Sequence, residues 1–425
     1  MEATAERSER HAKLRPWQHG MIFLLACVVI VLRRPDAIFH AQLYAEDGHV
    51  WFADAYNLGW WPALFRTWTG YYLTLPRLGA ALALLVPLSL VPLLLNIIAI
   101  FFHALPVNLL LIARSSEWGT LRFRAQLAAI YLVLPNCLEV SAGITDANWL
   151  LALSAIILLL ASTPKSVAGR LFEIFIMLLC GLTGPFCIFL LPISIFLAWR
   201  HRDHWRWIPA AILLLTSIAQ ARALLFVDPA VRTHQALGAS PLLFARILGG
   251  QVYLGAVLGG NGLSFSPNIG HIAFLVCVAV CGTAFITVCF LKSPLAMKLF
   301  LLFSALLFAG SLVSPLEWGH PEMSVWALLS GISGLRYWFF PTLAFAWALL
   351  WGYQSHVAPI KATSATLLCL MCIGVLRDWR HPALQETHFT ESVKRFEAAP
   401  VGTTVTIPVH PQGWTMQLVK HGSNR

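Results

Sequence analysis

The chain has 425 residues, of which 58% are hydrophobic and only 11% are charged. About 25% of the residues in an average soluble domain are charged, so this composition excludes a soluble globular protein and indicates a membrane protein. The net charge of +10 does not indicate a nucleic-acid partner, because Lys and Arg are spread over short loops instead of forming one basic stripe.

Apolar runs recur along nearly the whole chain, which predicts an all-α polytopic membrane protein with about eleven transmembrane helices. The expected divisions are a polar N-terminal tail (1–16), a transmembrane domain (17–376) and a polar C-terminal tail (377–425). Loops rich in Lys and Arg are expected on the cytoplasmic side. This bias places the N-terminus inside, and residues 33–70 as the first outer loop with a surface helix.

After the first crossing, Trp17–Leu32, the region 70–114 has two interpretations. Its apolar pieces Leu78–Leu90 and Leu93–Ala113 form either a hairpin of two crossings or a half-buried helix followed by one crossing. The arginines of 114–124 favour a single crossing, because this loop is then cytoplasmic.

The run 171–199 is interrupted by Gly184-Pro185, which predicts two short crossings with the break at the outer side. Residues 228–268 are expected outside, with a surface or re-entrant helix at Val252–Leu258. The tail carries VGTTVTIPV and PQGWTMQL, which predict a small cap or strand pair. The other predicted crossings are Gln126–Val140, Trp149–Ala161, Trp207–Val227, Ile269–Leu291, Leu299–Val313, Trp338–Tyr353 and Ala362–Leu376.

This topology gathers the acidic and unusual polar residues on the outer side, and the Lys/Arg-rich loops on the inner side. The outer set is Glu46, Asp47, Glu139, Asp146, Asn148, Asp228, Glu317, His320 and Glu322.

The most informative stretch is Leu43–Arg77, which opens with Glu46-Asp47-Gly48 and continues with many aromatic residues. Trp and Tyr favour the membrane–water boundary, so an amphipathic helix on the outer surface is expected. A carboxylate at this edge can act as a general base or hold a divalent cation. In the alternative interpretation, Asp47 is a helix N-cap.

Two arginines are candidate phosphate ligands. Arg77 lies in the apolar sequence LPRLGA, where it either binds a lipid phosphate, pairs with Asp47, or extends to the interface. Arg336 and Tyr337 begin an outer helix, where they either grip a phosphate or act as interfacial anchors.

Polar groups near other outer helix ends can form a sugar pocket. Glu139, Asp146 and Asn148 offer groups that bind hydroxyls, and the Trp149 ring can stack on a sugar; for Asp146 alone, a loop turn is an alternative. Glu317, His320 and Glu322 do not have zinc-site spacing, so a solvated loop is expected. No metal motif is found, and a divalent cation at the acid pair is the one cofactor considered.

Several short motifs are similar to the GT-C class of membrane glycosyltransferases, and most of all to a bacterial branch of that class. The motifs are AEDG (45–48), GYYLTLPR (70–77, including Tyr71), RYWFFP (336–341) and IPVHPQGW (407–414). The resemblance implies an inverting transferase of the bacterial inner membrane with a periplasmic C-terminal tail. The partners it implies are a polyprenyl-phosphate-linked sugar, membrane lipid, and a glycan, lipid or protein acceptor.

In that class an acid of the first outer loop activates the acceptor, which by resemblance is Asp47 with Glu46 as its neighbour or alternative. Basic residues hold the departing phosphate, and Arg336 matches by location. Two other functions remain open: a glycolipid transporter or flippase with a midplane site, and a glycan-assembly protein outside the GT-C class. The latter predicts key groups in 228–268.

Overall fold

The computed structural model describes residues 13–141, 143–227, 235–260, 272–317, 322–331 and 333–422. It is 72% helix and 5% strand, as an all-α membrane protein requires. Seven helical segments among the described residues are long and apolar enough to cross a membrane. They are α2 (Pro16–Arg33), α7 with the turn before it (Leu88–Leu111), α12 with its flanking turns (His204–Phe226), α13–α14 (Pro241–Leu258), α16 (Ile272–Lys292), α17 (Leu295–Val313) and α20 (Ala358–Arg377).

Four further helices complete the bundle: α8 (Leu121–Leu132), α9 (Ala147–Leu160), α10 (Val167–Gly181) and α11 (Phe186–His201). A fifth, α19 (Leu335–Tyr353), packs against α17, α20 and α8, and its side chains such as Trp347 are fully buried. The count of eleven crossings stays a prediction. Between residues 70 and 114 only α7 has spanning length, since α6 (Thr74–Ala83) has ten residues.

The predicted helix break is present. α10 ends at Gly181 and α11 begins after Pro185, and the intervening Gly184 has a φ of +85°. This left-handed backbone conformation suits glycine, and the proline cannot donate a helix hydrogen bond, so the two residues end one helix and start the next.

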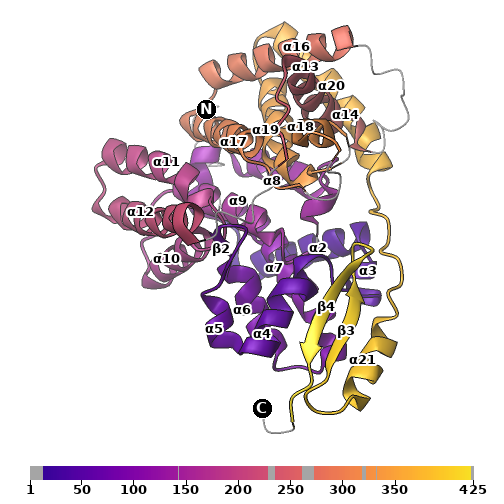
Figure 1. The fold of residues 1–425 in the computed structure, drawn as a ribbon. Helices are drawn as coiled ribbons and strands as arrows, with labels where there is room; N and C mark the ends of the chain where they lie inside the picture. The colour runs from indigo at the N-terminus through magenta and orange to yellow at the C-terminus, as the bar shows by residue number, and fades with distance from the viewer. Residues whose placement is uncertain are drawn as a thin grey trace.

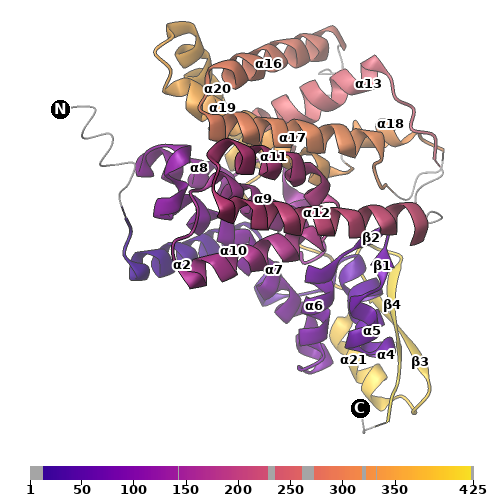
Figure 2. The same cartoon turned by 90° about the vertical axis from the view of Figure 1, so that its left-hand side faces the viewer.

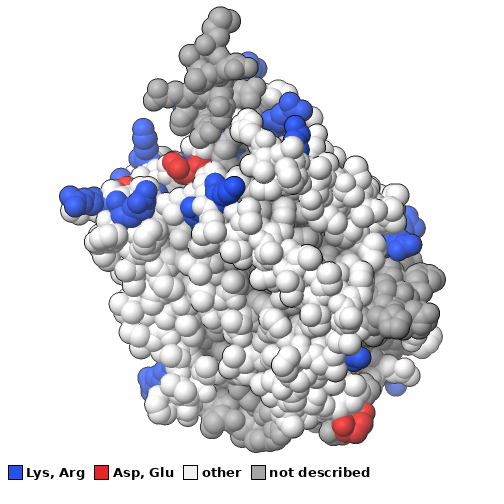
Figure 3. Space-filling view, turned by 90° about the horizontal axis from the view of Figure 1, so that it is seen from above, with Lys and Arg blue, Asp and Glu red and all other residues white. Residues whose placement is uncertain are grey.

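The helices α12, α16 and α17 run roughly alongside one another, and the surface elements lie beyond one end of the bundle (Figure 2). At the opposite end, basic loops meet: Ser162 N–H donates to Arg114 O at 2.8 Å, and Arg206 reaches Leu159 O at 3.0 Å. The face in Figure 3 carries most of its Lys and Arg in the upper part, above a broad uncharged surface. This arrangement suits a bundle whose sides face lipid.

A surface layer, residues 36–83, covers part of the other end. It contains α3 (Asp36–Phe39), a π-helical turn (Asp47–Phe52), α4 (Ala53–Leu58), α5 (Trp60–Leu64), the paired strands β1 (Thr67–Trp68) and β2 (Tyr71–Tyr72), and α6. The predicted surface helix is therefore several short pieces. The break after Leu58 falls at Gly59, whose φ of +88° stops α4.

The C-terminal tail packs on this layer, as the adjacent indigo and yellow elements of Figure 1 show. It contains α21 (Phe389–Ala398) and an antiparallel hairpin of β3 (Thr404–Val409) and β4 (Trp414–Val419), paired from Thr404↔Val419 to Val409↔Trp414. The predicted strand pair is confirmed. Ile407 and Met416 are fully buried in one apolar cluster with Trp51 and Phe52 of the surface layer.

The segment α13 (Pro241–Ala245), Arg246–Leu254 and α14 (Gly255–Leu258) belongs to the predicted outer region 228–268, whose residues 228–234 and 261–268 lie outside the described residues. Just before it, Ala236 O accepts from Val325 N–H; just after it, Gly260 N–H donates to Asp378 at 2.8 Å.

Candidate functional site

A cavity of about 650 Å³ lies where the surface layer meets the end of the bundle. Most of the bundle residues that line it are at or near helix ends, whereas Leu307 lies about two turns inside α17. Asn148 and Trp149 begin α9, Pro185 lies in the break before α11, Ser314 follows α17, and Arg336 begins α19. The site is therefore formed toward one end of the bundle.

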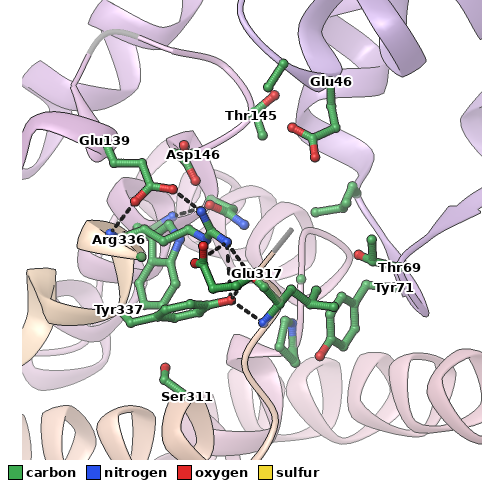
Figure 4. Close-up of a pocket in the computed structure, with 18 of the residues that line it drawn as sticks. Glu46, Thr69, Tyr71, Glu139, Thr145, Asp146, Ser311, Glu317, Arg336 and Tyr337 are labelled. Atoms are coloured by element: carbon green, nitrogen blue, oxygen red, sulfur yellow. Dashed lines mark hydrogen bonds and ion pairs between the residues drawn. The ribbon is translucent and has the colours of Figure 1, made fainter. Parts of the chain in front are cut away.

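The structure brings most of the predicted site residues to this cavity. Seven of them line it: Glu46, Tyr71, Glu139, Asn148, Trp149, Arg336 and Tyr337. Asp47 and Arg77 are not among the lining residues. Figure 4 shows the cavity with Glu46, Thr69 and Tyr71 on one side, and the group around Arg336 on the other.

Arg336 is held by two carboxylates. Its backbone N–H donates to Glu139 at 2.9 Å and its guanidinium bonds to the same carboxylate; it also donates to Glu317 at 3.2 Å (Figure 4). The Tyr337 ring lies 4.7 Å from the guanidinium, and its hydroxyl donates to Leu316 O at 3.1 Å. Arg336 is the one Lys or Arg side chain among the described lining residues, and Glu139 and Glu317 compensate its charge.

The expectation that Glu317 belongs to a solvated loop is wrong, because this side chain is only 6% exposed and pairs with Arg336. Burial raises the pKa of its carboxyl. Gly334 allows the close approach: its φ is +69°, and a Cβ there would lie 2.9 Å from Glu317 Oε1. Glu322 is exposed, and His320 lies outside the described residues, as does Asp228.

Two lining carboxylates are available to a ligand. Neither Glu46 nor Asp146 makes a side-chain hydrogen bond or ion pair with another residue in the described part of the chain. Asp146 is 8% exposed. Burial, and next the nearby charge of Glu46, raise the pKa of Asp146 well above its usual range. A buried acid with a raised pKa in the same cavity as a second acidic side chain is an arrangement typical of active sites.

Asp47 is buried just behind this surface, with 1% exposure. It accepts hydrogen bonds from Thr145, from Oγ1 at 2.6 Å and from the backbone N–H at 3.2 Å. Thr145 lines the cavity and in turn accepts a bond from Trp51 Nε1 at 2.9 Å. Burial raises the pKa of Asp47 to about 7, against the lowering effect of Thr145. Its carboxylate caps no helix N–H, so the N-cap interpretation is not supported.

Arg77 has a partner that the sequence did not indicate. Its guanidinium donates to Asp54 at 3.1 Å and lies 5.0 Å from the Trp51 ring, and the residue is 2% exposed. Asp54 also pairs with Arg66 at 2.9 Å. Arg77 therefore pairs with Asp54 and not with Asp47, and it is buried within the surface layer instead of facing a phosphate.

Sequence reasoning missed several lining residues: Trp68, Thr69, Thr145, Pro411 and Trp414. Pro411 and Trp414 belong to the motif IPVHPQGW, so that motif was the available signal. Within the described residues, no group of three or more His, Cys, Asp or Glu side chains is arranged to hold a metal ion. A scan against protein-family models and a search of curated proteins find no match for this chain.

Proposed function

We propose that this protein is a GT-C-type membrane glycosyltransferase that transfers a sugar from a polyprenyl phosphate to an acceptor hydroxyl on the periplasmic side. The observation that carries the proposal is the cavity at the bundle end, where the available carboxylates of Glu46 and Asp146 lie with aromatic rings and Arg336. Carboxylates bind sugar hydroxyls and accept protons, and aromatic rings pack on sugar faces.

The reaction needs a base for the acceptor hydroxyl. The acceptor oxygen attacks the anomeric carbon, the bond from that carbon to the phosphate oxygen breaks, and polyprenyl phosphate leaves with the bonding electrons. Glu46 takes the acceptor proton, because it lines the cavity and has no partner in the described structure. Burial raises the pKa of Asp146 and so favours its protonated form, which donates a hydrogen bond to a sugar oxygen.

Asp47 has a supporting role in this scheme, through Thr145. Arg336 is the one Lys or Arg side chain among the described lining residues, so it is the candidate to bind the phosphate. Its ion pairs with Glu139 and Glu317 lower the net positive charge there. Protonation of Glu317, which burial favours, leaves more of the guanidinium charge for an anion.

The position of the cavity supports transfer over transport. A transporter site is expected near the membrane midplane, whereas these lining residues lie at the ends of α9, α17 and α19. A site at the helix ends suits an acceptor that arrives from the aqueous side and a lipid-linked donor that stays in the bilayer.

The test is a mass comparison of cell-envelope glycans from a deletion strain complemented with wild type, Glu46→Gln or Asp47→Asn. A matched control is Glu391→Gln, because Glu391 is 76% exposed on α21, away from the cavity. We expect one sugar unit to disappear on deletion and to return with wild type and the control. It should stay absent with Glu46→Gln at equal protein level, and return only in part with Asp47→Asn.

Full restoration by Glu46→Gln would refute the role of Glu46 as the base. A deletion that changes no envelope glycan would contradict the transferase proposal itself and favour transport.

A further inference from the structure

The C-terminal hairpin forms part of the cavity wall. Pro411 and Trp414, at the turn between β3 and β4, are lining residues. The turn is fixed to the first outer loop: His410 N–H donates to Leu43 O at 3.1 Å, and Ala45 N–H donates to His410 O. The acid Glu46 directly follows this paired segment, so the hairpin and the candidate base are held by the same backbone contact.

Two indole rings border the cavity beside an imidazole. Trp68 of β1 and Trp414 of β4 both line the cavity and are half-buried. The His49 ring lies between them edge-on, with centroid distances of 6.4 Å and 5.3 Å. A hydrogen bond of 2.6 Å joins His49 Nδ1 and Thr415 O, next to Trp414. These contacts hold the two indoles in place without covering them.

The chemistry of this wall indicates its ligand. Indole rings offer rigid apolar faces, while Glu46 and Asp146 in the same cavity offer oxygens for hydroxyls. An aliphatic lipid chain would leave these acids unsatisfied, and a phosphate is a poor match for a wall lined by acidic side chains. A pyranose ring has both matching features: a face of C–H groups and an edge of hydroxyls.

We propose that Trp68 and Trp414 form a saccharide subsite that holds a pyranose ring of the acceptor, with its hydroxyls directed at the acidic residues. The acceptor is then a glycan, and the C-terminal hairpin contributes to its recognition. That this saccharide is the acceptor rests on the proposed transferase function, whereas the binding of a saccharide at these two rings does not.

The first test measures saccharide binding to the full-length protein in nanodiscs, by saturation-transfer NMR. The probes are the methyl α- and β-pyranosides of glucose, galactose, mannose and rhamnose. We expect saturable binding of at least one probe to wild type, and a roughly tenfold weaker Kd for Trp414→Ala and for Trp68→Ala. Trp414→Phe keeps an aromatic face and should bind within about threefold of wild type.

Trp61→Ala is the matched control, because Trp61 is an exposed tryptophan of the same surface layer that does not line the cavity. Thermal unfolding of each variant separates lost binding from lost folding. No binding of any probe to wild type overturns the proposal. Equal binding by Trp68→Ala and Trp414→Ala, both folded, overturns it as well.

A second arm separates this inference from the transferase proposal. Turnover of a radiolabelled undecaprenyl-phosphate glucose is followed with the best-bound pyranoside as acceptor. A rise in the acceptor KM for Trp414→Ala, with little change in kcat at saturating acceptor, supports the subsite. Unchanged acceptor KM in Trp414→Ala sinks the subsite while the transferase proposal stands. Saccharide binding that needs Trp414, without turnover of any added lipid-linked sugar, supports the subsite and counts against transfer.

Discussion

Replacing Asp47 with Asn should change how stability depends on pH. Burial raises the pKa of this carboxyl from its ordinary value of 3.8 to about 7. Between these values the unfolded chain is ionised while the folded chain keeps the proton, so the free energy of unfolding falls as pH rises. One pKa unit is worth about 1.36 kcal/mol, so the full cost is on the order of 4 kcal/mol, with about 2 kcal/mol of it between pH 5 and pH 7.

Asn keeps an oxygen that can accept the 2.6 Å bond from Thr145 Oγ1, but it cannot ionise. Relative to wild type, Asp47→Asn should therefore be more stable at pH 8 than at pH 5. The nearby Asp146 also has a raised pKa, partly from the charge of Asp47, so the substitution weakens that pH dependence in the same direction.

The assay is thermal unfolding of the purified protein in detergent at pH 5, 6, 7 and 8, read from the difference in Tm between variant and wild type. Glu391→Gln, which alters an exposed carboxylate, should show no such trend. A difference in Tm that is constant over this range, or that favours wild type increasingly toward pH 8, would refute the reasoning.

Two other substitutions test the packing around the site. Asp54→Ala leaves Arg77 buried without its carboxylate partner and should lower the free energy of unfolding by about 3 kcal/mol, seen as a lower Tm. Adding Arg77→Met removes the unpaired charge and should recover part of that loss. No recovery would contradict the pairing. Gly374→Ala should destabilise the contact of α20 with α14, because the new Cβ would lie 2.4 Å from Val257 O; Gly20→Ala, with open space around it, is the control and should leave Tm unchanged.

The sequence predicted the parts of the fold that local chemistry decides. The break at Gly184-Pro185 and the strand pair of the tail depend on backbone restrictions and side-chain alternation, which are visible in a short window. The division of the surface helix into several short pieces was not predicted, because these pieces depend on packing against the tail. The short helices α8 and α9 fall below spanning length, so the number of crossings cannot be derived from length alone.

At the site, the residue types were predictable but their pairings were not. Seven predicted residues share the cavity, because acids and aromatic residues at outer helix ends are brought to one place by the topology. The bond between Arg336 and Glu139 joins residues 197 positions apart, and the one between Asp47 and Thr145 joins residues 98 apart. No local pattern carries that information, and for this reason Arg77 and Glu317 were given the wrong surroundings.

The contact between the surface layer and the C-terminal hairpin constrains how this protein is made. His49 and Thr415 touch although 366 residues separate them. Segments in contact lie on the same side of a bilayer, so the chain between them crosses it an even number of times. During synthesis the cavity wall is finished only after the intervening helices have been inserted and the hairpin has been made. A misinserted helix would leave Glu46 without its aromatic neighbour Trp414, so a chain of incorrect topology would lack a complete site.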